Sequence, residues 1–261
     1  VTTGAASCAL GTSGVVFWHC DEPVFDRQAR LHSFCHAVPG KWHLMGVTLA
    51  AGGSLRWFRD TLCQEEVLQA STADQDPYDL MTAKAGKVGA GSEGLLFLPY
   101  LAGERTPYTD ASARGAFVGL SLAHSKAHMT RAVVEGVTMS LRDCVELARE
   151  VGIGADEMRV TGGGAKSKLW REILAATMNS TVNTTSVDEG PAYGAAMLAA
   201  VGVGAFGSVE QACMSLIRVS ESVEADDNQA RAYDAIYSLY RPLYGALKPF
   251  FKRSARVFGR L

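Results

Sequence analysis

Apolar residues between Ser125 and Gly152 recur three and four positions apart, which is the spacing of one face of an α-helix. These positions are Met129, Ala132, Val133, Val137, Leu141, Cys144, Val145 and Ala148. Glycine commonly follows the last turn of a helix, and Gly152 stands at that place. The pattern predicts one long amphipathic helix over residues 125–152.

Runs of small, branched and aromatic residues have the shorter period of β-strands. Two such runs fill residues 5–20 and meet at Gly11-Thr12-Ser13-Gly14, where glycine permits a tight turn. A β-hairpin is predicted there. Residues 42–62 indicate a short strand that leads into a helix, and only small residues occupy positions 50–53. We expect another segment to pack closely against that helix start.

Two strand–turn–helix units follow one another in the second half of the chain. The first has a strand at 159–161, the glycines 162–164 and a helix at 167–177. The second has an alternating strand at 181–187 and a helix that begins near Pro191, a residue tolerated in a first helical turn. Strands that alternate with helices predict an α/β layer architecture.

Three further segments are assigned from shorter patterns. Residues 77–86 predict a short helix, and residues 94–103 predict a buried strand that breaks at Pro99. A C-terminal helix is expected from Asp227 to about residue 240, with an interruption at Pro242. After it we expect a solvated basic tail with Lys252, Arg253, Arg256 and Arg260.

Composition and charge narrow the class of protein. The chain has 261 residues, 48% of them hydrophobic, enough for one large domain or two small ones. Its 25 Lys and Arg against 27 Asp and Glu give a formal charge of −2, which offers no field for nucleic acid or an anionic membrane. We find no apolar run near the roughly 20 residues that span a bilayer and no signal-peptide layout. The first residue is Val1, and we expect the chain to be part of a longer protein.

The cysteines indicate a reducing compartment. They are scattered among apolar residues with no CxxC pair, so we expect buried free thiols and a cytoplasmic location. The six are Cys8, Cys20, Cys35, Cys63, Cys144 and Cys213.

The glycine turn at 162–164 is the first candidate site. Glycine-rich approaches to helix N-termini bind phosphate, because unpaired N–H groups and the helix dipole favour an anion there. A Walker P-loop is excluded because Ala165 precedes Lys166-Ser167 where the motif needs glycine. A dinucleotide fingerprint loses its third glycine to Ser167. From this segment alone, a tight turn that binds no ligand is an open alternative.

Several segments taken together resemble the C-terminal half of the FGGY carbohydrate kinases. GTSG on a hairpin, TGGGAKSKLW and GPAYGAAMLA occur in that order. Residues 115–136 are similar to the family's C-terminal signature, with His128-Met129 and then Ala132 to Glu135 at the expected spacing. Residues 32–46 and 97–115 resemble the xylulokinases within the family.

The resemblance implies a fold and a reaction. The fold would be an actin-like ATPase, ribonuclease H-like lobe with a mixed central sheet and flanking helices, and residues 1–261 would be the C-terminal nucleotide-binding lobe. The reaction would be ATP- and Mg²⁺-dependent phosphorylation of a pentulose, D-xylulose to D-xylulose 5-phosphate foremost, with ADP as product. Ribulose, gluconate, glycerol and fuculose kinases share the lobe, and a non-catalytic actin-like nucleotide-binding module is the rival from another class. A homodimer is compatible with either interpretation.

The resemblance also assigns site residues. Gly11, Thr12, Ser13 and Gly14 match the second phosphate loop. Gly162, Gly163, Gly164 and Ala165 match the adenosine motif, with Gly164 against the base. Gly52 and Arg56 match the helix that covers the other side of the nucleotide, and Lys168 stands where several relatives use Asn. Residues 190–199 match a connecting helix between the lobes.

The resemblance places the remaining machinery outside this chain. A general-base Asp and the lobe with the sugar contacts would precede Val1, so no catalytic residue is assigned here and the 261 residues alone are expected to be inactive. No metal ligand is assigned either. His32 and His36 are four residues apart and His43 follows, but no acid or further ligand follows at zinc spacing. Glu104-Arg105 is expected to form an ion pair or a lobe contact.

Overall fold

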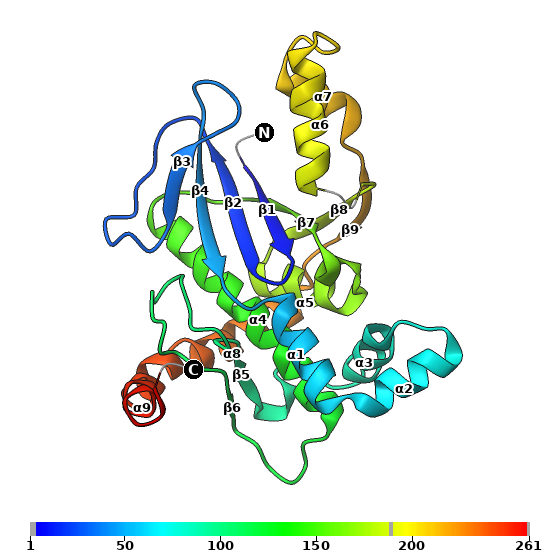
Figure 1. Ribbon diagram of the computed structural model, residues 1–261, viewed down its shortest axis with the longest axis vertical. Helices are drawn as coiled ribbons and strands as arrows, with labels where there is room; N and C mark the ends of the chain where they lie inside the picture. The colour runs from blue at the N-terminus through cyan, green and yellow to red at the C-terminus, as the bar shows by residue number, and fades with distance from the viewer. Residues whose placement is uncertain (1–3, 188–189, 260–261) are drawn as a thin grey trace.

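A computed structural model describes residues 4–187 and 190–259. Within those ranges its centre is a mixed seven-stranded sheet in the order β3-β4-β2-β1-β7-β8-β9 (Figure 1). β7 pairs in parallel with both β1 and β8, and the other neighbours are antiparallel. The strands are β1 (Ala5–Leu10), β2 (Gly14–Cys20), β3 (His32–Cys35), β4 (Trp42–Thr48), β7 (Glu157–Thr161), β8 (Thr181–Thr185) and β9 (Val219–Val223). The expected mixed sheet with flanking helices is confirmed.

The predicted long helix is α4 (Lys126–Glu150), and it crosses one face of the sheet (Figure 1). A capping box begins the helix: the Ser125 hydroxyl accepts from the backbone N–H of His128, and the His128 ring accepts from the backbone N–H of Ser125. Two glycines allow the helix to approach closely. A Cβ at Gly46 of β4 would lie 2.6 Å from the Cβ of Cys144, and one at Gly136 would lie 2.0 Å from the carbonyl oxygen of Phe97.

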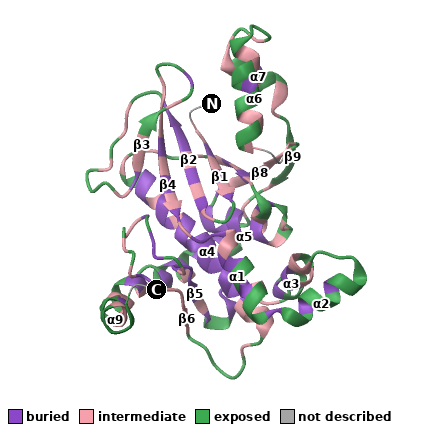
Figure 2. Cartoon of the chain, viewed as in Figure 1, coloured by how far each residue is buried: buried purple, intermediate pink, exposed green. Residues whose placement is uncertain are grey.

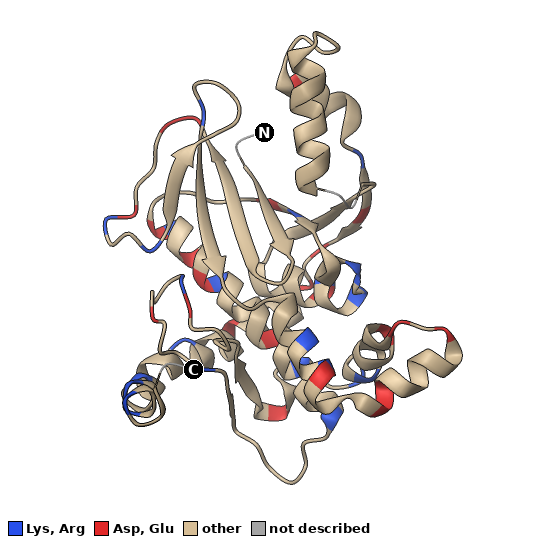
Figure 3. Ribbon diagram, in the orientation of Figure 1, with Lys and Arg blue, Asp and Glu red and all other residues tan. Residues whose placement is uncertain are grey.

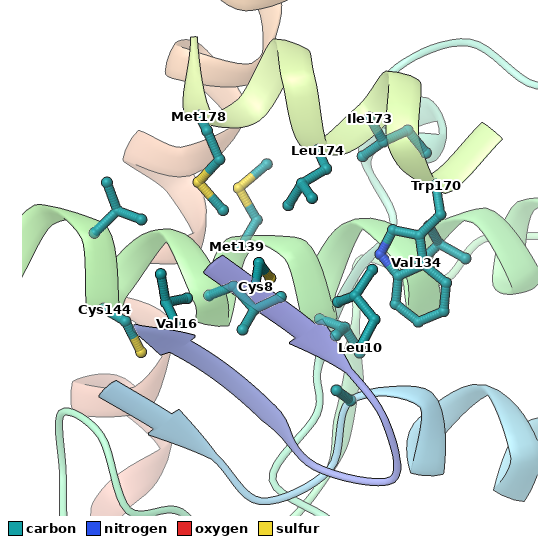
Figure 4. Close-up of a cluster of buried hydrophobic side chains, with 14 of the residues drawn as sticks. Cys8, Leu10, Val16, Val134, Met139, Cys144, Trp170, Ile173, Leu174 and Met178 are labelled. Carbon is teal, nitrogen blue, oxygen red and sulfur yellow. The ribbon is translucent and has the colours of Figure 1, made fainter. Parts of the chain in front are cut away.

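The main core lies between the sheet, α4 and α5 (Lys168–Met178). Alternate side chains of β1 face this core, and the same residues are buried (Figure 2). Figure 4 shows side chains from the three sources pointing toward one another: Cys8, Leu10 and Val16 from the strands, Val134, Met139 and Cys144 from α4, and Trp170, Ile173, Leu174 and Met178 from α5. Trp170 Nε1 also donates to Thr138 Oγ1 of α4 at 3.0 Å, so the indole is both packed and hydrogen-bonded.

The other elements lie around this core. They are α1 (Gly52–Leu62), α2 (Gln64–Ala73), α3 (Pro77–Ala85), β5 (Leu96–Leu98), β6 (Ala116–Val118), α6 (Gly190–Gly202), α7 (Val209–Leu216), α8 (Asp227–Tyr240) and α9 (Leu243–Phe258), with short 3-10 turns at Ser92–Gly94 and Gly163–Lys166. α6 and α7 lie on the opposite face of the sheet, because Ser7 and Arg159, which point away from α4, share a cavity with Tyr193 and Met197. α1, α2 and α3 form an arm beside the carboxyl edge of the sheet (Figure 1).

Two expectations from the sequence are wrong. Cys35 is exposed and Cys213 is half-buried, whereas the other four thiols are buried as expected. Cys35 lies at the end of the short edge strand β3, where the neighbouring Phe34 is exposed as well. Lys252, Arg253 and Arg256 do not form a tail, because the chain resumes a helix after Pro242 and they lie on the exposed face of α9. Arg260 lies outside the described residues. In the part of the chain that the structure describes, no helix is both long and apolar enough to cross a membrane.

Candidate functional site

A pocket of about 500 Å³ opens at the carboxyl edge of the sheet, where β1 and β7 end. The hairpin turn after β1, the start of α1 and the turn before α5 all meet at this edge (Figure 1). α3 closes the remaining side. The lining residues are Leu10, Gly11, Thr12, Gly52, Leu55, Arg56, Asp76, Tyr78, Asp79, Thr82, Gly163, Gly164, Lys166, Ser167 and Trp170.

Three glycines let separate backbone segments approach one another at the pocket. A Cβ at Gly52 would lie 2.6 Å from the carbonyl oxygen of Gly11, and one at Gly53 would lie 2.8 Å from that of Thr12. Gly162 has a φ of 88°, which disfavours other residues, and a Cβ there would lie 2.8 Å from the carbonyl oxygen of Leu10. The small residues at 50–53 therefore have the close packing partner that the sequence predicted, and it is the hairpin turn.

The hairpin turn is fixed to the start of α1 by hydrogen bonds. The N–H groups of Ala51 and Gly53 donate to the carbonyl oxygen of Thr12 at 2.9 and 3.0 Å, and Gly52 N–H donates to that of Gly11 at 2.8 Å. Early N–H groups of a helix otherwise lack partners, so this contact satisfies them. Arg56 Nη2 donates to Thr12 Oγ1 at 3.0 Å, which brings a cation and a hydroxyl together on the pocket wall.

Only two of the four residues of the predicted phosphate loop line the pocket. Gly11 and Thr12 line the pocket, whereas Ser13 and Gly14 do not. Gly14 is buried, and a Cβ on it would lie 2.7 Å from Thr48 Cγ2 and 2.8 Å from Leu141 Cδ2. Glycine at position 14 is thus explained by core packing.

The glycines of the second turn also differ from one another. A Cβ at Gly164 would lie 2.9 Å from Leu10 Cβ and 3.1 Å from the Trp170 ring, so core contacts already require glycine there. A Cβ at Gly163 would meet nothing within 4 Å, although this residue lines the pocket. Gly163 is therefore the bare position that faces open space. Ala165 is buried and lines a smaller neighbouring cavity instead.

Lys168 is not brought to the pocket. Its side chain is 80% exposed and its ammonium lies 3.7 Å from Glu172 one turn along α5. Lys166, two residues earlier, lines the pocket in its place. Ser167 is the N-cap of α5, and its hydroxyl accepts from Trp170 N–H, so the chain direction changes between the two lysines.

α3 supplies pocket residues that sequence reasoning missed: Asp76, Tyr78, Asp79 and Thr82. Asp76 caps α3 by accepting from Tyr78 N–H at 2.8 Å, and the Arg59 guanidinium stacks 4.8 Å from the centre of the Tyr78 ring. α1, which carries this arginine, lies beside α3 in the ribbon (Figure 3). Asp76-Pro77 signals the start of a helix in the sequence, but no local pattern shows that this helix packs on α2 and α4 and lines the same pocket as α1.

Comparison with known proteins settles the family. The model for the FGGY family of carbohydrate kinases, C-terminal domain, matches residues 6–203. The chain belongs to this family. A xylulose kinase of Staphylococcus epidermidis is 41% identical over 244 residues, which are 94% of this chain and 47% of the relative. A gluconokinase of Bacillus subtilis is 36% identical over 212 residues, 80% of this chain and 41% of that protein.

Solved structures of FGGY kinases have the same fold. The ligand-bound xylulose kinase from Lactobacillus acidophilus has a TM-score of 0.85 at 29% identity and covers 96% of this chain and 49% of that one. The gluconate kinase from the same organism has a TM-score of 0.84 at 28% identity, again with 96% of this chain and 49% of the other covered. The actin-like ATPase fold expected from the sequence is therefore confirmed, and the chain spans about half the length of the relatives it matches.

The histidines weighed above as zinc ligands are engaged in other contacts. His32 Nε2 accepts from Arg105 Nε at 2.9 Å, His36 Nδ1 accepts from the N–H of Val38 at 2.9 Å, and the His43 ring stacks on Phe17 at 4.5 Å. Among residues 4–187 and 190–259 no group of three or more His, Cys, Asp or Glu side chains could hold a metal ion.

Of the two alternatives for Glu104-Arg105, the ion pair is not formed between these two residues, and the lobe contact stays a prediction. Glu104 is 3% exposed, and its carboxylate accepts from Thr48 Oγ1 and from the N–H groups of Leu49 and Arg105 at 2.7 to 3.0 Å. Burial raises the pKa of the Glu104 carboxyl to about 7. The Glu104 side chain is buried, because residues 104–106 pack against the end of β4.

Gly163→Ala and Gly164→Ala should affect stability differently. We expect Gly164→Ala to lower the free energy of unfolding by about 1–3 kcal/mol, because the added methyl must displace Leu10 or Trp170. Gly163→Ala should change it by less than about 0.5 kcal/mol. Urea denaturation of both variants measures this. Equal stability of the two variants would show that contacts with Leu10 and Trp170 do not require glycine at position 164.

Glu104 should make stability depend on pH. The folded protein retains this proton where the unfolded chain, with a carboxyl pKa near 4.5, has released it, so the free energy of unfolding falls as pH rises from about 4.5 to about 7. Glu104→Gln should remove up to about 3 kcal/mol of that fall. Asp143, whose pKa burial also raises to about 7, should leave a residual slope. Urea denaturation across this range measures both, and an unchanged slope in Glu104→Gln would contradict the assignment.

Proposed function

We propose that this chain is the nucleotide-binding lobe of an ATP-dependent sugar kinase, with D-xylulose as its first candidate substrate. The observation that carries the proposal is the pocket in which Thr12, Arg56 and the bare Gly163 backbone converge from three separate segments. Support for the domain assignment comes from the match to a C-terminal domain and from the 47% of the xylulose kinase relative that the chain covers. The other lobe would supply the sugar site and the base.

The proposed arrangement places the phosphates at the hairpin and the base beyond it. Thr12 Oγ1 and the Arg56 guanidinium offer one hydroxyl and one cation to phosphate oxygens, and Gly11 keeps the backbone accessible. A flat base would lie along Gly163 between α1 and α3, where Tyr78 and Thr82 offer hydroxyl groups. Donors fixed before the reaction stabilise the charge that develops on a transferred phosphoryl group.

Mg²⁺ is expected with the nucleotide, although among the described residues no group of three or more His, Cys, Asp or Glu side chains could hold a metal ion by itself. Mg²⁺ in kinases is commonly held by substrate phosphates and one or two carboxylates. No step of the mechanism is therefore assigned to the ion here. The step that this lobe would serve is transfer of the γ-phosphoryl group to a sugar hydroxyl, which yields ADP, a sugar phosphate and a proton.

Gluconate is the second candidate sugar, because a gluconokinase matches 80% of this chain at 36% identity. The full-length enzyme assayed with D-xylulose, D-ribulose, gluconate and glycerol would decide between them. We expect the highest kcat/KM with D-xylulose, since several xylulose kinases match more than 90% of the chain. A higher kcat/KM with gluconate would overturn the choice of sugar and leave the nucleotide lobe unaffected.

Nucleotide binding by the 261 residues tests the pocket directly. Isothermal titration with ATP should give a measurable Kd, and Arg56→Ala should weaken it about tenfold, since one charge-assisted hydrogen bond is lost. Lys168→Ala is the matched control, because it also removes a cation but from an exposed site outside the pocket, and its Kd should stay within about twofold. A larger effect of Lys168→Ala than of Arg56→Ala would show that the nucleotide binds elsewhere.

Turnover should require the other lobe. The 261 residues alone should form no xylulose 5-phosphate from ATP and D-xylulose in a coupled assay.

In the full-length enzyme, Thr12→Val keeps a branched side chain but removes a donor, so kcat should fall about 10²-fold with a smaller change in the KM for sugar. Unchanged turnover in Thr12→Val would make the hairpin a structural turn only, and turnover by the isolated chain would refute the division between lobes.

A further inference from the structure

A buried carboxylate stands behind the hairpin turn and contacts no residue of the pocket. Glu104 Oε2 accepts from Thr48 Oγ1 at 2.7 Å, and Oε1 accepts from Leu49 N–H at 3.0 Å and from Arg105 N–H at 2.7 Å. Among the residues that the structure describes, no cation forms a salt bridge with Glu104. Three neutral donors therefore hold this carboxylate in place at considerable cost in desolvation.

The edge of β4 explains why an acceptor is needed there. β3 pairs with β4 only as far as Met45, so the outer edge beyond it has no strand neighbour. Thr106 takes over: its N–H donates to Val47 O at 3.0 Å, and Val47 N–H donates to Thr106 Oγ1 at 3.1 Å. Glu104 continues the pairing by one step, since its carboxylate accepts from Leu49 where a strand would offer a carbonyl oxygen.

Leu49 is the first residue of the turn that leads to the hydrogen bonds with the hairpin. Residues 49–51 connect β4 to α1, and the next contacts along the chain are the N–H groups of Ala51, Gly52 and Gly53 with the carbonyl oxygens of Gly11 and Thr12. Ser140 Oγ of α4 also donates to Thr48 Oγ1 at 3.3 Å, which ties the same turn to the core helix. The position of the hairpin thus depends on a turn whose first N–H is held by Glu104.

We propose that Glu104 is a positioning residue for the nucleotide pocket. It holds the turn at 49–51, and through that turn it sets where Gly11 and Thr12 stand relative to Arg56. Because phosphate donors must be in place before the reaction, a shift of this turn weakens nucleotide binding without removing any group that contacts the nucleotide. The inference rests on the proposed function for the nucleotide, whereas the structural link from Glu104 to the hairpin does not.

Asp143 provides a matched control. It is also a buried carboxyl, 5% exposed, with a pKa that burial raises to about 7, and it accepts from the Tyr237 hydroxyl of α8 at 2.6 Å. Glu104→Ala and Asp143→Ala should both lower the melting temperature. Only Glu104→Ala should affect the hairpin. Glu104→Gln should rescue it, because the amide oxygen still accepts from Leu49 N–H.

The test combines amide hydrogen exchange with ATP titration on the same chain. In Glu104→Ala, exchange at residues 51–53 should rise at least about tenfold, and the Kd for ATP should weaken about tenfold. Asp143→Ala and Glu104→Gln should keep both quantities within about 1.5-fold of the parent, below the rise expected of any variant that loosens the turn. If Glu104→Ala does not fold, Thr48→Val removes one of the same hydrogen bonds in a β-branched side chain, and it should raise exchange and the Kd about threefold.

Two results would overturn the proposal in different ways. Parental exchange at 51–53 in Glu104→Ala, or in Thr48→Val where the former does not fold, would reduce Glu104 to a stability residue. Equal weakening of ATP binding by Asp143→Ala would do the same. If exchange rises in Glu104→Ala but the parent chain binds no ATP, the nucleotide assignment fails while the link from Glu104 to the hairpin stands.

Discussion

Close approach of backbone segments at the carboxyl edge of the sheet is the constraint on which the pocket depends. The carbonyl oxygens of residues 10–12 stand less than 3 Å from the places that a Cβ on Gly52, Gly53 or Gly162 would occupy. A side chain at any of these positions would have to displace backbone rather than another side chain, which close-packed structures tolerate poorly. The hairpin, the first turn of α1 and the turn after β7 are therefore locked together. The pocket is the space that remains between them.

Glycines also bring α4 close to strands of two different sheets. Gly46 of the central sheet accommodates Cys144 of the helix, and Gly136 of the helix accommodates the carbonyl oxygen of Phe97 in β5, which pairs with β6 in a separate two-stranded sheet. Through Ser140 and Thr48 the helix also reaches the turn that supports the hairpin. The core helix and the wall of the pocket are thus connected through the hydrogen bond between Ser140 and Thr48.

Long periodic segments were predictable because one face of each contacts the core along its length, as in α4, α5 and the hairpin. β3 and β9 were missed because these edge strands are short and mostly exposed, so they have no apolar face to detect. Glycine turns were recognisable, but which glycine faces the pocket depends on Leu10 and Trp170, which approach only in the folded chain. The exposed position of Lys168 and the place of the α3 residues in the pocket lining could not be predicted for the same reason. Local sequence does not encode the direction of a side chain at a helix start or the packing of one helix on another.

The likeness of this lobe to kinases with different names bears on where sugar specificity resides. The Lactobacillus acidophilus xylulose kinase and gluconate kinase superpose on it almost equally well, with TM-scores of 0.85 and 0.84. A geometry shared by enzymes named for a pentulose and for a sugar acid cannot itself distinguish the two. If this chain holds the nucleotide as proposed, its task is the presentation of a phosphoryl group, which is chemically the same for every acceptor. Selection of the acceptor then requires contacts other than those of the phosphate donors, because specificity is a difference between affinities and these donors contribute equally to each.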